Sequence, residues 1–392
     1  MVNHLSRRAF LSRSAVIGCS AAASPILTPI TLASAPWDTR LVVLVLRGGM
    51  DGLDAIRPYG ARELRQLRGD LGAGPEGGAV DLDGFFAMHP MLAPLESLWN
   101  AKELAFVHAV STPYRDKRSH FDGQDILEAG TPGLVSGSDG WLNRMLGALS
   151  NTEPRTAFAL GHGEMKVLSG PEPILNWSPE ADLALSPQAE LLAQHVMQND
   201  PAMLAALRDA IDLTADSESM TAGNKGDGAQ SKIAEFAATQ LRGDTRIVSF
   251  SVNGWDTHRS QIRSIRGALR RLANTILTLQ KGVGPNVWSK TAIVAMTEFG
   301  RTAALNGSGG TDHGTGGAMV LAGGAVRGGR VYGDWPGLAE ADLYARRDLM
   351  ATGDVRRPAA WILSGLSGLP KSTLENVVFP GLDMEHDPGI LL

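Results

Sequence analysis

Five apolar runs along the chain predict five buried strands. Each run is built from β-branched and other apolar residues and lacks the polar alternation of a half-exposed strand, so we expect these strands to be covered on both faces. Glycines close several of the runs and favour tight turns at the strand ends. The runs are Leu41–Gly49, Leu104–Val110, Arg246–Val252, Thr291–Met296 and Ala318–Gly323.

Helical periodicity separates most of these runs. Apolar residues recur every three or four positions over Met91–Lys102 and Gln261–Leu279, which is the pattern of amphipathic helices. Strands that alternate with helices are typical of a mostly parallel sheet with helices on both faces. The sequence therefore predicts an α/β fold, a three-layer α/β/α sandwich with a mostly parallel central sheet, in one domain over residues 36–392.

Between about residues 170 and 242 the pattern changes to amphipathic helices without strands between them. This segment is interpreted as a helical insertion. It can cap the functional site, or its helices can cover one face of the sheet, and the sequence leaves both arrangements open.

The first 35 residues have the features of an export signal rather than of a fold. Ser6–Leu11, "SRRAFL", is a twin-arginine motif, and a mildly apolar run and the small residues Ala33–Ala35 follow it. We expect the leader to be recognised by the twin-arginine export machinery and the mature protein to be periplasmic or secreted. The one cysteine, Cys19, lies in this leader, so the mature core has no disulfide to stabilise it.

Net charge excludes one class of partner. The formal charge is -5, and removing a leader with three arginines and no acids leaves 33 basic against 41 acidic residues, or -8. Nucleic-acid binding requires clustered basic residues, so we do not expect that function. The sequence after the leader contains no apolar stretch long enough to cross a membrane.

Polar side chains follow or precede the predicted strands at their ends. Because ligands of open α/β sheets bind beyond the carboxyl ends of the strands, we expect these side chains to gather at one edge of the sheet. Along the chain they are Asp51 and Asp54, Ser119 and His120, Asp256 and His258, Glu298 and Arg301, and finally Asp312 and His313 in a glycine-rich loop.

Converging carboxylates repel one another unless one is protonated or a cation lies between them. Two or three carboxylates with two imidazoles are a ligand set suited to zinc or manganese. We therefore expect one or two divalent metal ions at this edge. Ser119 precedes a predicted helix, where a serine is either a simple N-cap or a nucleophile whose oxygen is stabilised by the helix N-terminus.

Several motifs resemble those of an exported bacterial family, domain-of-unknown-function 1501. They are "RGGMDGLD", "RSHFDGQD", "NGWDTH", "TEFGRT" and "GGTDHGTGGAMVLAGG", together with the twin-arginine leader. The order of the site residues also resembles, more loosely, the alkaline phosphatase superfamily, which includes sulfatases and metal-dependent phosphoglycerate mutases.

The resemblance implies roles for these residues. Ser119 resembles the nucleophile, and either Arg118 or Arg301 is placed to hold the non-bridging oxygens of the ester. Asp256, His258 and His313 resemble the ligands of one metal. Asp51, with Asp54 as a rival, resembles the first-strand metal ligand. Glu298 resembles the late-strand carboxylate of the second metal, and His120 or Asp312 completes that site because Phe299 stands where the superfamily has a histidine.

On this resemblance the protein is an exported metal-dependent hydrolase of phosphate or sulfate esters, acting on a small-molecule or polymer substrate. The alternative is a non-catalytic relative that binds a polymer or serves in the cell envelope. A metal-dependent mutase is a third reading, which export disfavours.

Overall fold

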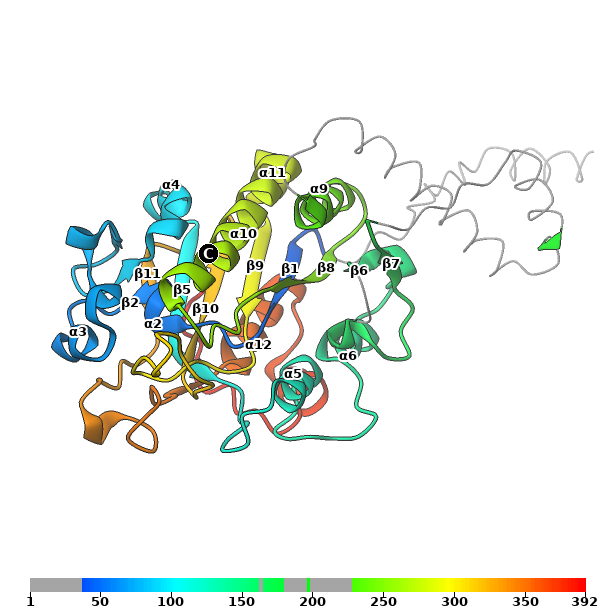
Figure 1. Ribbon diagram of the computed structural model, residues 1–392. Helices are drawn as coiled ribbons and strands as arrows, with labels where there is room; N and C mark the ends of the chain where they lie inside the picture. Colours follow the sequence, from blue (N-terminus) through cyan, green and yellow to red (C-terminus); the bar gives the residue numbers. More distant parts are fainter. Residues whose placement is uncertain (1–36, 162–164, 180–195, 198–227) are drawn as a thin grey trace, which may run out of the picture.

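The computed structural model describes residues 37–161, 165–179, 196–197 and 228–392 (Figure 1). The predicted leader lies outside the described residues. Most of the predicted helical insertion lies outside them as well. The architecture below refers to the described part of the chain.

The described residues form one large mixed sheet with nine strands. Its strands are β1 (Arg40–Arg47), β5 (Leu104–Ser111), β6 (Ala157–Leu160), β7 (Leu175–Trp177), β8 (Ile247–Asn253), β9 (Thr291–Met296), β10 (Gly317–Ala322), β11 (Arg330–Tyr332) and β12 (Gly353–Asp354). Their order is β11-β5-β10-β9-β1-β8-β6-β7. The short strand β12 also pairs with β5, at residues of β5 that follow those paired with β11.

The strands run mostly parallel. β1 lies between β8 and β9 and is parallel to both, and β6 is parallel to β8 and β7. β10 alone among the described strands of this sheet opposes its neighbours, because it pairs antiparallel with both β9 and β5. All five predicted strands are present, and the predicted α/β fold with a mostly parallel sheet is confirmed.

Helices cover both faces of the sheet. Alternate residues of β1 belong to two separate apolar cores: Val42 packs in one and Val43 in the other. The first core is covered by α4 (Glu96–Asn100), α9 (Gly228–Arg242), α10 (Gln261–Val283) and α11 (Pro285–Trp288). The second is covered by α6 (Trp141–Ala148), α12 (Arg356–Ser367) and the inner side of α5 (His120–Ala129). The result is three layers (Figure 1).

A small second sheet lies beside the first, with the order β2 (Ile56–Arg57), β4 (Ala87–Met88) and β3 (Val80–Asp81). The short helices α2 (Gly52–Ala55) and α3 (Arg62–Arg68) belong to the same part of the chain, and α13 (Lys371–Thr373) lies near the end. Pro94 interrupts the helix predicted over 91–102, because proline cannot donate its amide. The segment is a 3-10 helix, Pro90–Leu95, followed by α4.

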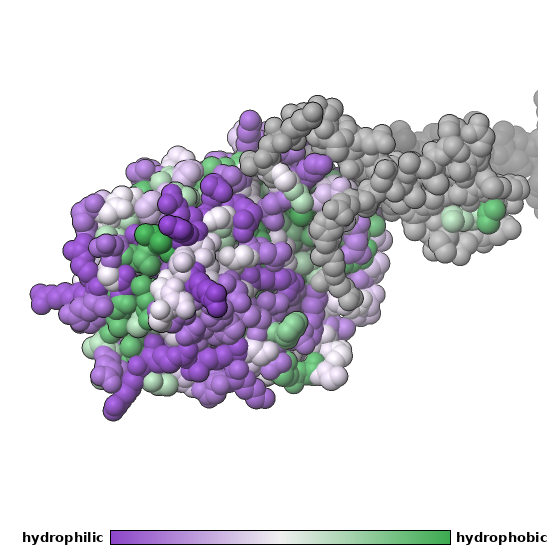
Figure 2. All heavy atoms as spheres, viewed as in Figure 1, coloured by the Kyte–Doolittle hydropathy of each residue, from purple (hydrophilic) through white to green (hydrophobic). Residues whose placement is uncertain are grey.

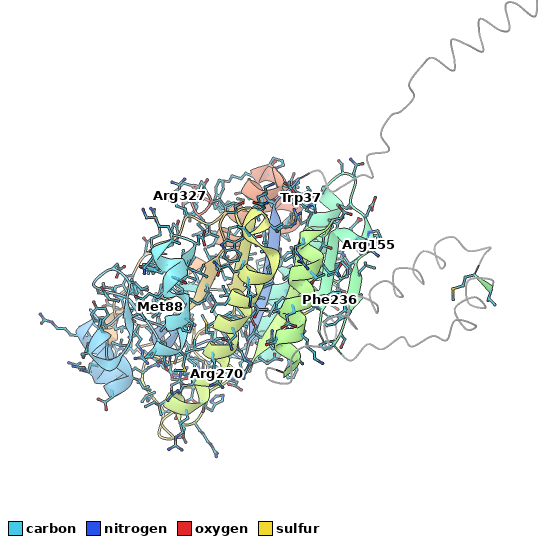
Figure 3. The ribbon with its side chains drawn as sticks, turned by 90° about the horizontal axis from the view of Figure 1, so that it is seen from above. Trp37, Met88, Arg155, Phe236, Arg270 and Arg327 are labelled. Carbon is cyan, nitrogen blue, oxygen red and sulfur yellow. The ribbon has the colours of Figure 1, made fainter. Side chains whose placement is uncertain are left out.

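Two described parts of the predicted insertion, β7 and α9, belong to the main layers. α9 lies beside α10 on one face of the sheet (Figure 3), and β7 extends the sheet at one end. Residues 180–195 and 198–227, which carry the rest of that prediction, lie outside the described residues. Across the helices that the structure describes, none combines the length and apolar character that a membrane crossing requires.

Candidate metal centre

A glycine-rich loop brings distant residues to one edge of the sheet. The loop leaves the end of β9 and returns to the start of β10, which lies at the same edge because β10 is antiparallel. A Cβ on Gly310 would lie 2.2 Å from the carbonyl carbon of His258, so only glycine allows the two backbones to approach this closely. The Thr311 amide then donates to the Thr257 carbonyl at 3.0 Å.

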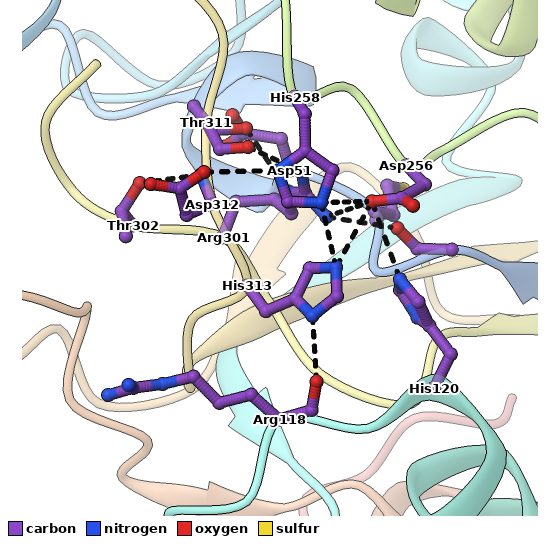
Figure 4. Close-up of polar contacts among 12 residues, drawn as sticks. Asp51, Arg118, His120, Asp256, His258, Arg301, Thr302, Thr311, Asp312 and His313 are labelled. Carbon is purple, nitrogen blue, oxygen red and sulfur yellow. Dashed lines mark hydrogen bonds and ion pairs between the residues drawn. The ribbon is translucent and has the colours of Figure 1, made fainter. Parts of the chain in front are cut away.

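One carboxylate oxygen lies at the centre of the resulting cluster. Asp256 Oδ1 is 3.0 Å from His258 Nε2, 3.2 Å from His313 Nε2 and 3.4 Å from His120 Nε2 (Figure 4). His120, Asp256 and His313 each offer a ligand atom within 4.8 Å of the others. The fourth side chain, His258, lies beside them, since its Nε2 is also 3.0 Å from His313 Nε2.

The opposite nitrogen of each imidazole contacts an oxygen. His120 Nδ1 lies 2.7 Å from Glu298 Oε1, His258 Nδ1 lies 3.0 Å from Asp312 Oδ1, and His313 Nδ1 lies 2.7 Å from the Arg118 carbonyl oxygen. A carbonyl oxygen can only accept, so His313 Nδ1 carries the proton. Histidines that bind metals are held in this way by a carboxylate or carbonyl behind the ring.

This tautomer pattern leaves several lone pairs facing one another. When both rings are neutral with Nδ1 protonated, the Nε2 atoms of His258 and His313 present lone pairs across 3.0 Å. His120 Nε2 is buried and makes no hydrogen bond, because its 3.4 Å contact with Asp256 is within ion-pair range but is not aligned as a hydrogen bond. A cation among these atoms removes the repulsion, and imidazole with carboxylate donors fits zinc or manganese.

Arg301 orients the central carboxylate. Its side chain is fully buried, and its NH1 donates to Asp256 Oδ1 at 2.8 Å. Partial burial raises the pKa of Asp256, but the hydrogen bond and charge of Arg301 outweigh this effect and lower it to about 2. The remaining donors of Arg301 contact Thr311 and the Gly48 carbonyl. From the sequence, Arg301 was a candidate to bind the anionic ester. In the structure its guanidinium is buried and hydrogen bonds to groups of the protein itself.

Glu298 lies behind His120 rather than in the cluster. Its carboxylate is fully buried and accepts from the Gly48 amide at 2.9 Å and from Gln124 at 3.1 Å, as well as contacting His120. Burial raises the pKa of Glu298, but the hydrogen bond with His120 is the leading effect that brings it below the usual value. Phe299 stacks on the His120 ring, with centroids 5.0 Å apart. Glu298, predicted as a ligand of a second metal, therefore positions His120.

Asp51 and Asp54 are also held away from the cluster. Asp51 is buried against Arg68, with 2.7 Å between Oδ2 and NH1, and it accepts from Gln261 at 2.9 Å. Asp54 pairs with Arg57 at 2.9 Å. Guanidinium partners thus neutralise both carboxylates, and the structure does not bring the predicted first-strand ligand to the metal centre.

Ser119 and Arg118 lie immediately before α5. The Ser119 hydroxyl is the N-cap of this helix and accepts from the Asp122 amide at 3.4 Å. Arg118 has a φ of 54°, and its carbonyl faces His313 while its guanidinium extends away from the cluster (Figure 4). That guanidinium lies 3.5 Å from the buried Asp348.

Three contributors to the site were not singled out from the sequence. Gln124 hydrogen bonds to Glu298, Asn306 donates to Asp312 at 3.0 Å, and Asp348 anchors Arg118. Each lies in a sequence context ordinary for a helix or a loop. Their contacts depend on the folded loops, although the position of Gln124 one turn after His120 on α5 is a signal that helical spacing offers.

We expect Glu298→Gln to weaken zinc binding by about 10- to 100-fold, because an amide oxygen accepts a weaker hydrogen bond from His120 Nδ1 than a carboxylate oxygen does. Calorimetric titration of the metal-free protein with Zn²⁺ measures this. Glu128→Gln is the matched control, since Glu128 is equally buried but pairs with Arg47. Equal zinc affinities of the two variants would contradict the positioning role of Glu298.

Several solved structures are similar in chain path. Two are of Ps i-CgsB, with TM-scores of 0.36 and 0.35 at 9% and 10% identity, and the first is a complex with k-i-k-neocarrahexaose. Each similarity covers 85% of this chain and 72% of that chain. A protein in the alkaline phosphatase superfamily from Vibrio parahaemolyticus has a TM-score of 0.31 at 10% identity, over 85% of this chain and 69% of its own.

No curated protein matches the sequence. A family does match, over residues 110–357, and its description is "Protein of unknown function (DUF1501)". That range is more than half of the chain and contains the four residues of the cluster. The protein is therefore a member of the DUF1501 family.

Proposed function

We propose that this protein is an exported, divalent-metal-dependent hydrolase of phosphate or sulfate esters. The observation that carries the proposal is the convergence of three imidazole Nε2 atoms on Asp256 Oδ1, with each opposite nitrogen against an oxygen. Such a set binds a cation tightly only where the fold has arranged both the ligands and the groups behind them.

His120, Asp256, His258 and His313 would hold one zinc or manganese ion. A bound ion would supply Lewis-acid polarisation of the ester and stabilise charge that develops on its oxygens. We propose a single ion, because Asp51 is paired with Arg68 and Glu298 is hydrogen bonded to His120. Asp256, kept ionised by Arg301, offsets part of the positive charge of the ion.

Ser119 is the proposed nucleophile. Its hydroxyl stands at the N-terminus of α5, directly before His120, and the positive end of the helix favours an oxygen that carries negative charge. Its Oγ bonds to phosphorus or sulfur as the ester oxygen leaves, and the hydroxyl proton ends on the departing alcohol. Water then cleaves the serine ester and restores the hydroxyl.

The test separates nucleophilic from structural roles of Ser119. We expect Ser119→Ala and Ser119→Asn both to lower turnover of p-nitrophenyl phosphate or p-nitrophenyl sulfate by at least about 1,000-fold. Asparagine preserves the N-cap, so only the alanine variant should lose stability, by about 1 kcal/mol. Zinc binding is expected to survive in both.

Two outcomes contradict the proposal. Turnover that persists in the asparagine variant would remove Ser119 as the nucleophile. A metal-loaded wild-type protein that hydrolyses neither ester would favour the alternative, a metal-containing protein that binds its ligand without cleaving it.

A further inference from the structure

One side of α10 is a row of exposed arginines. Arg263, Arg266 and Arg270 recur at the three- and four-residue spacing that places side chains on one helical face, and Arg259 lies just before the helix, directly after His258. All four are exposed. We call these four residues the basic row. At 1.5 Å per residue its helical part, from Arg263 to Arg270, extends for about 10 Å.

Within the part of the chain that the structure describes, the basic row is not neutralised by acidic residues. Helix α10 contains no aspartate or glutamate over its 23 residues. Among the described residues, no carboxylate pairs with the guanidinium group of any member of the row. Strongly hydrophilic residues gather over this helix in Figure 2, and Figure 3 labels Arg270 on it.

The row begins at the metal centre. Arg259 directly follows His258, and its backbone forms a bridge with Gly309 in the glycine-rich loop. The amide of Gln261, at the first turn of α10, donates to the Gly309 carbonyl at 2.7 Å. The same loop carries Asp312 and His313. The first turn of α10 and the residues just before it therefore contact the loop that carries two residues of the site.

We propose that the basic row binds a linear polymer, other than a nucleic acid, that carries repeated sulfate or phosphate groups, and guides it to the metal centre. Along α10 successive arginines of the row are separated by about one helical turn, or roughly 5 Å, which suits one anionic group on each successive unit of an extended polymer. Arginine binds such groups through paired hydrogen bonds. This inference rests on the proposed ester hydrolysis and narrows its substrate to an anionic polymer.

An anionic membrane is a less suitable partner for this surface. Binding to a lipid surface normally combines basic residues with several apolar side chains that enter the bilayer. On α10 the exposed large apolar residue is Ile262 alone. A single row of arginines matches the linear array of charges on a polymer better than it matches the flat charged surface of a membrane.

The experiment measures binding without turnover. A variant with all four residues of the row changed to glutamine is compared with a variant that loses four other exposed arginines. We expect fluorescent dextran sulfate to bind the first variant at least about 30-fold more weakly than wild type, and the second within about 3-fold. The dependence of log Kd on log salt should fall by about 3 in the first variant, by analogy with counterion release from charged polymers. The control residues are Arg62, Arg242, Arg327 and Arg330.

Equal losses in the two variants would overturn the proposal, because binding would then follow net charge alone. Tighter wild-type binding to phosphatidylglycerol vesicles or to duplex DNA than to dextran sulfate would also overturn it. A selective loss of dextran sulfate binding in the first variant supports it even if the wild type cleaves no ester, so failure of the docking surface and failure of the proposed hydrolysis are distinguishable.

Discussion

Replacing His313 with alanine is expected to lower zinc affinity by at least about 100-fold. Its Nε2 lies 3.2 Å from Asp256 Oδ1 and 3.0 Å from His258 Nε2, so its removal opens the centre of the cluster. A residue behind a ligand changes affinity by about 10- to 100-fold, and loss of the ligand itself should exceed that range. Wild type is expected to bind one equivalent of zinc.

Metal analysis after dialysis, followed by calorimetric titration, measures both quantities. His386→Ala is the control, because His386 is exposed and lies near the end of the chain, away from the four residues of the cluster. Unchanged affinity in the His313 variant would show that zinc binds elsewhere. Two equivalents in wild type would contradict the single-ion proposal and return Asp51 and Glu298 to consideration as ligands.

Arg68→Ala is expected to destabilise the protein by about 3–5 kcal/mol. The Arg68 and Asp51 side chains are each 1% exposed, and the substitution leaves the carboxylate buried without its charge partner. It also removes donors to the Ala303 and Thr302 carbonyls, at 2.6 and 2.7 Å. This loss is a large part of the 5–15 kcal/mol that ordinarily separates folded from unfolded states.

Urea unfolding followed by tryptophan fluorescence gives the free energy. Arg65 provides the comparison within the same helix: it pairs with Glu76 at 2.7 Å, but both side chains are more than half exposed. Arg65→Ala should therefore cost about 0–1 kcal/mol. If the two alanine variants lost similar stability, the interpretation of the Asp51 pair as a buried structural element would be wrong.

The hydrophobic pattern predicted the strands well, because a strand buried on both faces appears in the sequence as a continuous run of apolar residues. The run over 291–296 coincides with β9, and the run over 104–110 lies within β5. The direction of β10 relative to its neighbours was harder to predict. A loop with many glycines is compatible with a crossover or with a return at the same edge, and only the pairing of β10 with β9 and β5 distinguishes them.

The sequence likewise predicted some features of the site and not others. Residue types at the strand ends predicted where the chemistry gathers, and Asp256, His258 and His313 do lie together. The partner of each carboxylate could not be predicted, because it depends on contacts between remote segments. Asp51 meets Arg68, which lies on a short helix 17 residues away, and Glu298 meets His120 across 178 residues. A carboxylate that faces a guanidinium or an imidazole looks the same in sequence as one that faces a metal.

The antiparallel course of β10 has a consequence for how the site can change. The segment from Thr297 to Gly317 leaves the sheet and rejoins it at one edge, and it carries Glu298, Arg301, Asp312 and His313. Its exchange would replace the support of His120, the support of Asp256 and one proposed ligand together, while the order of the strands stays the same. One proposed ligand and the side chains that position the others thus lie in a single loop, and changes within that loop can alter the site without any change in the order of the strands.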